Sequence, residues 1–418
     1  MNRSAVRILA GLALGLIGGA VVSGRPLAAP MLEVTAPVGR LWLDALTMTV
    51  VPLVFSLLVT GILGAAQDAR QDRVALRALL WFAALLCGGC LAAAASTSLL
   101  LHLWPVGDAA ALRPVGTVPV IGGAGDWLGN IIPTNPIKAA AETAMVPLVV
   151  FALFFGFAAA RVAPELQRAL QTMFRAIAET MLVIVQWVLL VAPIGVFALA
   201  FGLGARAGSG AVAVLAHYVV VVACACLLIG VLAYVVVLVF GGLSPIRFAK
   251  AALPAQVVAL STQSSLATLP AMIEAAPALG IERNAAGIIL PLAVSIFRAA
   301  SAAANIAVAL YLAAVYGVSP GIGMLVMGAL VAAAVSLAAV GLPAQVSFFA
   351  TIGPVCLALG VPVELLPLLL AVETIPDLFR TVGNVTADMA VMRLAGGRGS
   401  AGAGDDRGHQ RDAVDVAV

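Results

Sequence analysis

The residues of this chain that could do chemistry are concentrated near its C-terminal end, inside a long apolar stretch. Steps of four, three, four and four positions connect five polar residues, which therefore share one face of a helix. They are Glu373, Asp377, Arg380, Asn384 and Asp388. Arginine offers a planar fork of donors to a carboxylate, whereas aspartate accepts hydrogen bonds from an ammonium group. The pattern predicts a binding site for a zwitterionic or anionic small molecule; the alternative is a self-neutralising stripe that only holds helices together.

The composition indicates which kind of element must position these residues. Of 418 residues, 63% are hydrophobic and only 10% are charged, with a mean hydropathy of +1.14. Soluble domains contain about 45–50% apolar and about 25% charged residues. So few charges cannot cover a water-facing surface, which excludes a soluble enzyme, a nucleic-acid-binding protein and a disordered protein. We predict an all-α polytopic membrane protein, in which an ionisable residue at membrane depth is costly and indicates a functional site.

Apolar runs of about 20 residues are long enough to cross a bilayer. Eight runs meet this length, at 8–24, 41–65, 78–104, 144–160, 176–204, 209–242, 285–317 and 363–392. With eight crossings and a cytoplasmic N-terminus, basic residues are about three times as frequent on the cytoplasmic side as outside, in line with the positive-inside rule. We therefore expect a multi-pass protein of the inner membrane with both termini in the cytoplasm. Pro376 removes a backbone hydrogen bond within the last run, so a kink is expected just before Asp377.

Two further apolar segments, 251–276 and 322–360, are interrupted by Pro, Gly, Ser and Gln. A polar turn between two apolar arms is typical of a re-entrant hairpin, because non-helical backbone at membrane depth is tolerated only where it is buried or lines a cavity. Helix N-termini at such turns direct free N–H groups at an anionic ligand. Two hairpins, each followed by a span that carries polar residues, indicate a duplicated hairpin–helix unit, which is a known plan of transporters.

Other candidate chemistry is poorly supported. The five cysteines lie in apolar runs or isolated pairs and the three histidines are isolated, so no zinc site is expected. No HExxH motif and no facing pair of catalytic carboxylates occurs, and we therefore expect neither an enzyme nor a bound cofactor nor a nucleic-acid partner.

At five places the sequence resembles the dicarboxylate/amino acid:cation symporter family, which contains the glutamate transporters. The stretches are Val51–Gly61, Asn135–Pro136 with Val149–Gly156, Ala192–Phe197, Ser261–Pro270 and Asp377–Asp388. They occur in family order and together span about residues 1–395. The resemblance implies a glutamate-transporter-like elevator fold with eight transmembrane helices, two re-entrant hairpins and inverted repeats, assembled as a homotrimer in membrane lipid.

The same resemblance implies a fixed scaffold and a transport domain that slides across the membrane. Scaffold helices one and two are expected at 1–65, and the outside loop with scaffold helices four and five at 105–208. The transport domain is expected to combine helix three at 66–104 with helix six, hairpin one, helix seven, hairpin two and helix eight at 209–395. The remaining residues, 396–418, are expected to form a disordered cytoplasmic tail.

The resemblance also implies roles for individual residues. Arg380 corresponds to the arginine that binds the substrate side-chain carboxylate, and Asp377 to the aspartate that binds its amino group. Polar substrate contacts are implied at Thr381, Asn384, Ser264, Ser265 and Ser301. Leu342 and Pro343 correspond to the tip of the outer gate, and Asp388 to an aspartate that coordinates sodium.

The sequence departs from the family at the seventh helix. An Asn-Met-Asp-Gly-Thr motif that is central to sodium binding is replaced here by Phe297-Arg298-Ala299-Ala300-Ser301. Without its Asn and Asp the usual sodium coupling is not expected, and without its Gly an unwound turn is less expected. Arg298 is a candidate tethered cation beside Asp388; the alternative is that it snorkels or pairs with a backbone carbonyl. Coupling to protons through Glu373 or Asp388, or exchange without coupling, then takes the place of sodium coupling.

These observations favour a secondary transporter of acidic amino acids such as aspartate and glutamate, since Asp377 and Arg380 together match an amino group and a carboxylate. A C4-dicarboxylate transporter of the same fold is the first alternative, although such relatives tend to lack the aspartate that binds the amino group. A non-transporting binding protein or an anion-conducting pore is the second. The coupling ion, its stoichiometry and the direction of flux do not follow from the sequence.

Overall fold

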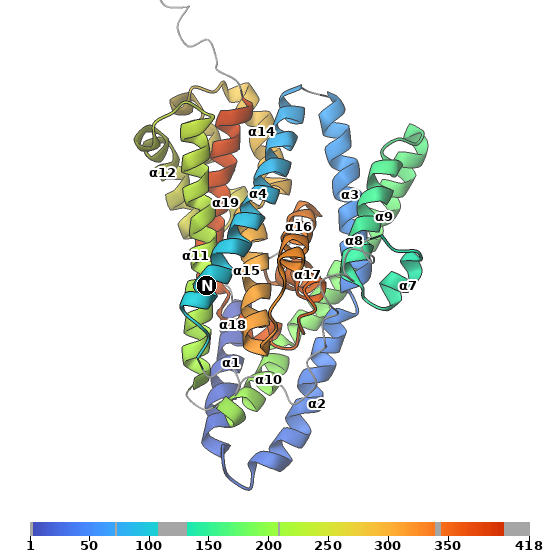
Figure 1. Cartoon of the computed structure of the whole chain (residues 1–418), viewed down its shortest axis with the longest axis vertical. Helices are drawn as coiled ribbons and strands as arrows, with labels where there is room; N and C mark the ends of the chain where they lie inside the picture. Colours follow the sequence, from blue (N-terminus) through green and yellow to red (C-terminus); the bar gives the residue numbers. More distant parts are fainter. Residues whose placement is uncertain (1–2, 72, 108–131, 208–209, 339–343, 397–418) are drawn as a thin grey trace, which may run out of the picture.

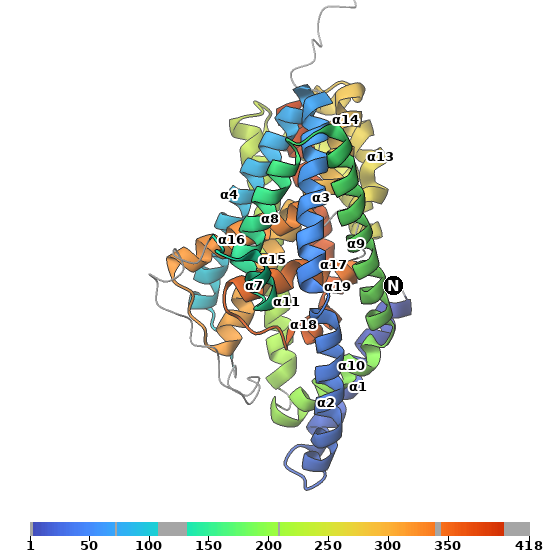
Figure 2. The ribbon, with the colours of Figure 1, turned by 90° about the vertical axis from the view of Figure 1, so that its right-hand side faces the viewer.

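The computed structural model describes residues 3–71, 73–107, 132–207, 210–338 and 344–396. Within these ranges the chain forms helices joined by turns and contains no strand, as predicted. Figures 1 and 2 show most of the long helices running roughly along the long axis of the molecule. Five helical stretches of the described part are long and apolar enough to cross a membrane: Ala28–Gln67, Arg73–Leu103, Pro164–Leu190, Val212–Val239 and Arg283–Tyr316. The total of eight crossings stays a prediction.

Helix α1 (Arg3–Val22) packs closely along α10 (Ala192–Ala207). Glycines of α1 permit this approach, since a Cβ added at Gly11 or Gly15 would lie 2.5 Å from the backbone oxygen of Pro193 or Phe197. Small residues at helix contacts are typical of membrane proteins, because in lipid the close fit of backbones takes over from the hydrophobic effect as the driving force.

The second run is longer than predicted. α2 (Ala28–Thr47) also packs on α10, and after a turn at residues 48–49 the chain continues as α3 (Val50–Gln71), so the helical stretch extends beyond 41–65 at both ends. α3 packs against α8 (Met145–Ala159) and α9 (Pro164–Leu190). A short helix, α7 (Pro136–Ala141), precedes α8.

The single run predicted at 176–204 is in fact two helices, α9 and α10, which are separated at Val191. The physical reason is Pro193 near the start of α10. Its nitrogen carries no hydrogen and cannot extend the hydrogen-bond ladder of α9. The sequence motif Ala192–Phe197 therefore forms the start of a new helix, α10, which packs along α1.

Besides the group formed by α1, α2, α3, α8, α9 and α10, four further helices form a second group with a core of its own. α4 (Arg73–Leu103), α11 (Gly210–Val239), α15 (Ala299–Tyr316) and α19 (Thr374–Ala395) pack against one another (Figure 1). Nearly every residue of α15 is buried, and many of them are alanine. A helix that is apolar on all sides is expected in the interior, and its small side chains let the neighbouring helices approach.

Two helices of this part are interrupted in their interior. α14 (Arg283–Ile296) and α15 are separated by Phe297 and Arg298. This corrects the expectation that losing the glycine makes an unwound turn less probable here. Phe297 and Arg298 have φ angles of −97° and −102°, which side chains of any kind tolerate, so the interruption needs no glycine.

The second interruption, at Glu373, separates α18 (Leu366–Val372) from α19. It lies three residues before Pro376, the position of the predicted kink. The reason is Pro376, whose nitrogen cannot donate to the carbonyl of Val372 and whose ring crowds that carbonyl. Glu373 is therefore placed at a junction between two helices instead of in the middle of one.

Both broken segments contain two helices that pack against each other, and these pairs are called the first and the second hairpin. The first consists of α12 (Pro245–Thr262) and α13 (Ser265–Ala275), followed by the 3₁₀ helix η1 (Pro277–Leu279), and the second of α16 (Ile322–Ala338) and α17 (Ala344–Ala358). α12 and α13 pack against α19. α16 and α17 pack against α15 and, on their other side, against α3 and α8 (Figure 2). Trp42 of α2 meets Phe349 of α17 edge-on, with 6.3 Å between ring centroids. The second hairpin is thus held between the two groups of helices.

Candidate functional site

Buried charges of opposite sign meet where α18 joins α19. The Arg380 guanidinium forms an ion pair with one oxygen of Glu373, and the two residues are only 3% and 5% exposed. The hydroxyl of Tyr218, on α11, donates a hydrogen bond of 2.6 Å to the other Glu373 oxygen. A desolvated ion pair is stable only when its remaining hydrogen bonds are also satisfied. Tyr218 fulfils this condition for Glu373.

Arg380 retains unused binding capacity. Its Nε is buried and donates no hydrogen bond within the described structure. Asp377, one turn earlier on α19, is half-buried and takes part in none of the ion pairs formed by the described residues. A guanidinium donor and a carboxylate are therefore available within one helical turn. Together they can bind a ligand that carries both a carboxylate and an ammonium group.

Asn384 connects α19 to the first turn of α15. Its Oδ1 accepts hydrogen bonds from the N–H groups of Ala300 at 2.9 Å and Ser301 at 3.2 Å, and its Nδ2 donates to Ser301 Oγ at 2.9 Å. These N–H groups have no partner within their own helix. Thr381 donates from its hydroxyl to the backbone oxygen of Asp377 at 2.8 Å. Three of the five predicted polar ligand contacts, Thr381, Asn384 and Ser301, thus bond to the protein itself in this structure.

Asp388 is a second buried carboxylate on α19, with an exposure of 0%. Neither of its oxygens accepts a hydrogen bond within the described structure. Arg298 is half-buried in the interruption before α15, and its charge acts on both Asp377 and Asp388. The backbone oxygen of Arg298 accepts a hydrogen bond from Ser336 of α16 at 3.2 Å. A buried carboxylate without hydrogen bonds requires a cation or a proton nearby, and the charge of Arg298 partly meets this requirement.

The altered motif offers no side-chain oxygen at positions 297 and 299. Phe297 stacks on Phe82 of α4, with 4.8 Å between ring centroids and 12° between ring planes. Phe297 and Ala299 also line a cavity of about 210 Å³ whose other walls are apolar residues of α4, α11 and α19. Nowhere in the described ranges do three or more His, Cys, Asp or Glu side chains gather as a metal site. Asp388 therefore offers a cation a single, isolated carboxylate.

The serines of the first hairpin lie at its turn. Ser264 caps α13, with its Oγ accepting a hydrogen bond from the N–H of Ala267 at 3.2 Å, and Ser265 is the first residue of that helix. The hairpin is tied to the charged helix by a hydrogen bond of 2.9 Å from Gln256 of α12 to the Thr386 hydroxyl of α19. The predicted gate residues of the second hairpin, Leu342 and Pro343, lie outside the described residues.

Sequence reasoning missed Tyr218. The only signal for it is a tyrosine inside a long apolar run, one of four in the chain, and a buried tyrosine hydroxyl usually has a hydrogen-bond partner. Its neighbour His217 lies with Nδ1 3.4 Å from the Tyr311 hydroxyl and Nε2 3.2 Å from the backbone oxygen of Trp104. These contacts link α11 to α15 and to the residue that follows α4.

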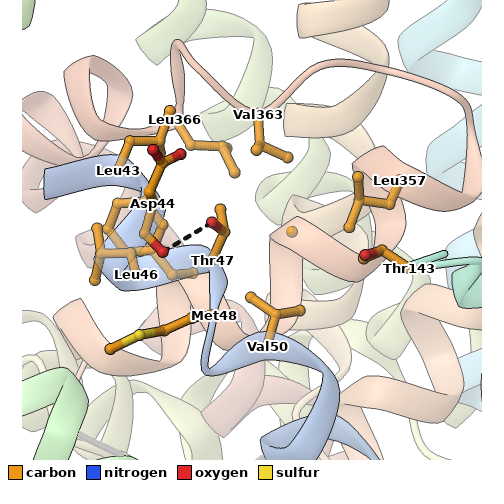
Figure 3. Close-up of a pocket in the computed structure, with 12 residues that line it drawn as sticks. Leu43, Asp44, Leu46, Thr47, Met48, Val50, Thr143, Leu357, Val363 and Leu366 are labelled. Atoms are coloured by element: carbon orange, nitrogen blue, oxygen red, sulfur yellow. Dashed lines mark hydrogen bonds between the residues drawn. The ribbon is translucent and has the colours of Figure 1, made fainter. Parts of the chain in front are cut away.

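A separate cavity of about 360 Å³ lies beside the turn between α2 and α3, facing α17 and α18 (Figure 3). Its lining is mostly apolar, with Asp44, Thr47 and Thr143 as the polar members. Figure 3 shows the Thr47 hydroxyl bonded to the backbone oxygen of Asp44, at 3.1 Å. None of the predicted site residues lines this cavity, so it is distinct from the charged cluster.

Comparison with known proteins shows which family has a similar sequence. The model of the sodium:dicarboxylate symporter family matches residues 5–395. The chain is 28% identical over 381 residues to the proton/glutamate-aspartate symporter of Escherichia coli (strain K12), covering 87% of this chain and 85% of that protein. It is 27% identical over 399 residues to the proton/sodium-glutamate symport protein of Bacillus subtilis (strain 168), covering 92% and 90%. A C4-dicarboxylate transport protein of Azorhizobium caulinodans is 29% identical over 266 residues, which are 61% of this chain and 58% of that protein.

Proposed function

The chain belongs to the sodium:dicarboxylate symporter family, and from this membership we propose that it is a secondary transporter of acidic amino acids such as aspartate and glutamate in the inner membrane. The family consists of symporters and not of enzymes. Relatives are named for two substrate classes, acidic amino acids and C4-dicarboxylates. The chain is accordingly a membrane transporter for one or both of these classes.

The observation that carries the choice of amino acids is that Asp377 and Arg380 lie one turn apart on α19. The buried, unpartnered Nε of Arg380 is suited to a substrate carboxylate. Asp377, which makes no ion pair among the described residues, is suited to the substrate ammonium group. A dicarboxylate such as succinate would bring no positive charge to Asp377, and two carboxylates would then lie close together in a desolvated site.

For the architecture we propose the plan that the resemblance implies, a homotrimeric elevator. α1 to α3 and α7 to α10 would form the scaffold, and α4 with α11 to α19 the transport domain. The proposal is supported by packing, because α1 and α2 pack on α10 and α3 packs on α8 and α9, whereas α4, α11, α15 and α19 share a core. The second hairpin, which packs against α3 and α8, is the surface along which the transport domain would slide.

For the driving force we propose that sodium is not coupled in the usual way, and that protons drive transport or that the protein exchanges substrates. The support comes from the altered motif, whose side chains at 297 and 299 line an apolar cavity and offer a cation no ligand. Asp388 alone is a poor sodium site, because several oxygen ligands must replace the hydration shell of the ion. The charge of Arg298 further opposes the entry of a second cation beside Asp388.

Uptake of radiolabelled aspartate into proteoliposomes tests the proposal. Saturable uptake that excess glutamate competes away, equal in a sodium and in a choline gradient, is the expected result. Uptake of succinate in place of aspartate would instead establish the dicarboxylate alternative. Binding of aspartate without any uptake or exchange would establish the binding-protein alternative.

A further inference from the structure

The cavity beside the turn between α2 and α3 is bounded by both groups of helices. Its apolar lining includes residues of α2 and α3 on one side and of α17 and α18 on the other, namely Leu46, Val50, Phe349, Leu357 and Leu366. Its volume of about 360 Å³ lies within the range of small-molecule pockets, which is about 300–1,000 Å³. The cavity is therefore large enough for a compact organic ligand.

Asp44 is the one charged residue among the described residues that line this cavity. It lies within Ala28–Gln67, a stretch that is long and apolar enough to cross a membrane. Its exposed carboxylate makes no hydrogen bond or ion pair with a described residue, and Arg40, one turn earlier on α2, does not pair with it. An ionisable residue in such a stretch indicates a function and requires a partner of opposite charge. Asp44 therefore gives the cavity an unpaired negative charge.

Two hydroxyl groups complete the polar part of the lining. Thr47 donates to the backbone oxygen of Asp44 at 3.1 Å, and its own oxygen can still accept a hydrogen bond. Thr143 has a φ angle of 55°, which is unusual and costly for a β-branched residue and is typical of functional sites. Figure 3 shows its hydroxyl on the side of the cavity, across from Thr47 and Val50. The cavity thus combines one negative charge, two hydroxyl groups and apolar walls.

We propose that this cavity binds a small amphipathic ammonium compound, whose positive charge pairs with Asp44 and whose apolar body lies against α3, α17 and α18. An ammonium group donates charge-assisted hydrogen bonds to a carboxylate, and the apolar body gains free energy when the walls remove it from water. An acidic amino acid is disfavoured, because its net negative charge would meet Asp44 and the described lining contains no arginine or lysine. The ligand class therefore differs from that of the transported substrate.

A ligand in this cavity would hold the two groups of helices together. In the proposed elevator, α2 and α3 belong to the scaffold and α17 and α18 to the transport domain, so sliding separates the walls of the cavity. A ligand that binds only while the walls are together stabilises this state by mass action. The binding itself is independent of the proposed function, whereas its effect on transport rests on that function. The ligand should inhibit uptake without competing with aspartate.

Calorimetry on the purified full-length protein at about pH 7 tests the binding. The probes are 4-phenylbutylamine, 4-phenylbutanol and 4-phenylbutyrate, which share one apolar body and carry a positive charge, no charge and a negative charge. The amine should bind saturably, and about tenfold or more tightly than the alcohol, as expected for a hydrogen bond to a charged group. The acid should bind most weakly. Equal affinities for amine and alcohol would overturn the proposed ligand class.

Asp44→Asn tests the charge while it keeps the shape of the cavity. This variant should lower the affinity for the amine about tenfold and leave that for the alcohol unchanged. Glu33→Gln is the control, because Glu33 is an exposed acidic residue of the same helix that does not line the cavity; it should bind the amine normally. Normal amine affinity in Asp44→Asn would overturn the site. So would binding that does not saturate and is equal in all variants, since this indicates partition into detergent.

Gly353→Leu tests the cavity itself. A Cβ added at Gly353 would have one neighbour within 4 Å among the described residues, Val50 Cγ2 at 3.9 Å, so the larger side chain can extend into the cavity. It should weaken the binding of amine and alcohol alike. Gly64→Leu on α3 is the control, because a Cβ there meets nothing within 4 Å and Gly64 does not line the cavity. Normal amine binding by Gly353→Leu that is folded, as judged by thermal unfolding, would overturn the site.

Uptake of radiolabelled aspartate into proteoliposomes tests the effect on transport. The amine should lower the maximal rate and leave the half-saturating aspartate concentration unchanged, and Asp44→Asn should resist the amine. Equal inhibition of both proteins would show that the amine only dissipates the gradient, and would overturn the inhibition. Amine binding that depends on Asp44, in a protein that takes up no aspartate, would refute the proposed function and support the site. Aspartate uptake by a protein that binds no amine would refute the site alone.

Discussion

The guanidinium of Arg380 pairs with Glu373, two turns earlier in the chain, and not with Asp377, which is only one turn away. The interruption between α18 and α19 lies at Glu373, so its backbone is not held in an unbroken helix. Asp377 is left without an ion-pair partner among the described residues. Glu373, at the junction before α19, thus neutralises the arginine, while Asp377 of α19 remains available to a ligand.

Replacing Arg380 with alanine should abolish aspartate binding while the protein still folds. Loss of one partner of a desolvated charge pair costs about 2–5 kcal/mol, which corresponds to roughly 30-fold or more in affinity. Calorimetry measures the affinity. Arg393→Ala is the control, because Arg393 lies on the same helix and donates to the backbone oxygens of Gly241 and Leu279; its loss should lower stability and leave affinity unchanged. Normal aspartate binding by Arg380→Ala would refute the site.

Replacing Asp377 with asparagine should change which substrate is preferred. In the unmodified protein aspartate should compete for uptake better than succinate, since succinate offers Asp377 no positive charge. In Asp377→Asn the amide no longer needs an ammonium partner, so the two inhibition constants should approach each other. Competition assays against radiolabelled aspartate and glutamate measure this ratio. Equal competition by succinate in the unmodified protein would favour the dicarboxylate alternative.

Sodium should have no effect on substrate affinity. The expected result is equal affinity in sodium and in choline at fixed ionic strength, because the charge of Arg298 already acts on Asp388. Arg298→Met should lose substrate binding, and added sodium should not restore it, since positions 297 and 299 provide no side-chain oxygen. A tightening of about tenfold or more by sodium, roughly 1.4 kcal/mol, would contradict this prediction.

Replacing Asn384 with alanine should destabilise the protein in addition to any effect on binding. The variant loses three hydrogen bonds, two of which cap the N–H groups of Ala300 and Ser301. Loss of a helix cap costs about 0.5–2 kcal/mol, and buried groups left unsatisfied add about 1–3 kcal/mol. Thermal unfolding of the purified protein measures the loss. Ser244→Ala, which removes one exposed cap bond of 3.4 Å on α12, should lower the melting temperature less; an equal effect would show that the Asn384 bonds add little.

The sequence alone determined the class of the protein and the region of its site. A chain with 63% hydrophobic and 10% charged residues can only bury that surface in a membrane or in helices that pack within one. Pro, Gly and Ser mark the two hairpins because these residues act locally on the backbone. The shared helical face of the polar residues from 373 to 388 follows from their spacing alone. The sequence also shows directly that positions 297 and 299 hold neither Asn nor Asp.

Only the tertiary structure decided how these residues are used. The spacing of α19 allows Arg380 to reach Glu373 or Asp377, and the choice depends on the helix junction at Glu373 and on Tyr218, which is 155 positions away in the chain. The unwound turn at Phe297 and Arg298 persists without glycine, because its backbone angles suit any residue and Asn384 of another helix caps the new start. Such contacts join residues that are distant in sequence, so they depend on how whole helices pack, and no local pattern encodes them.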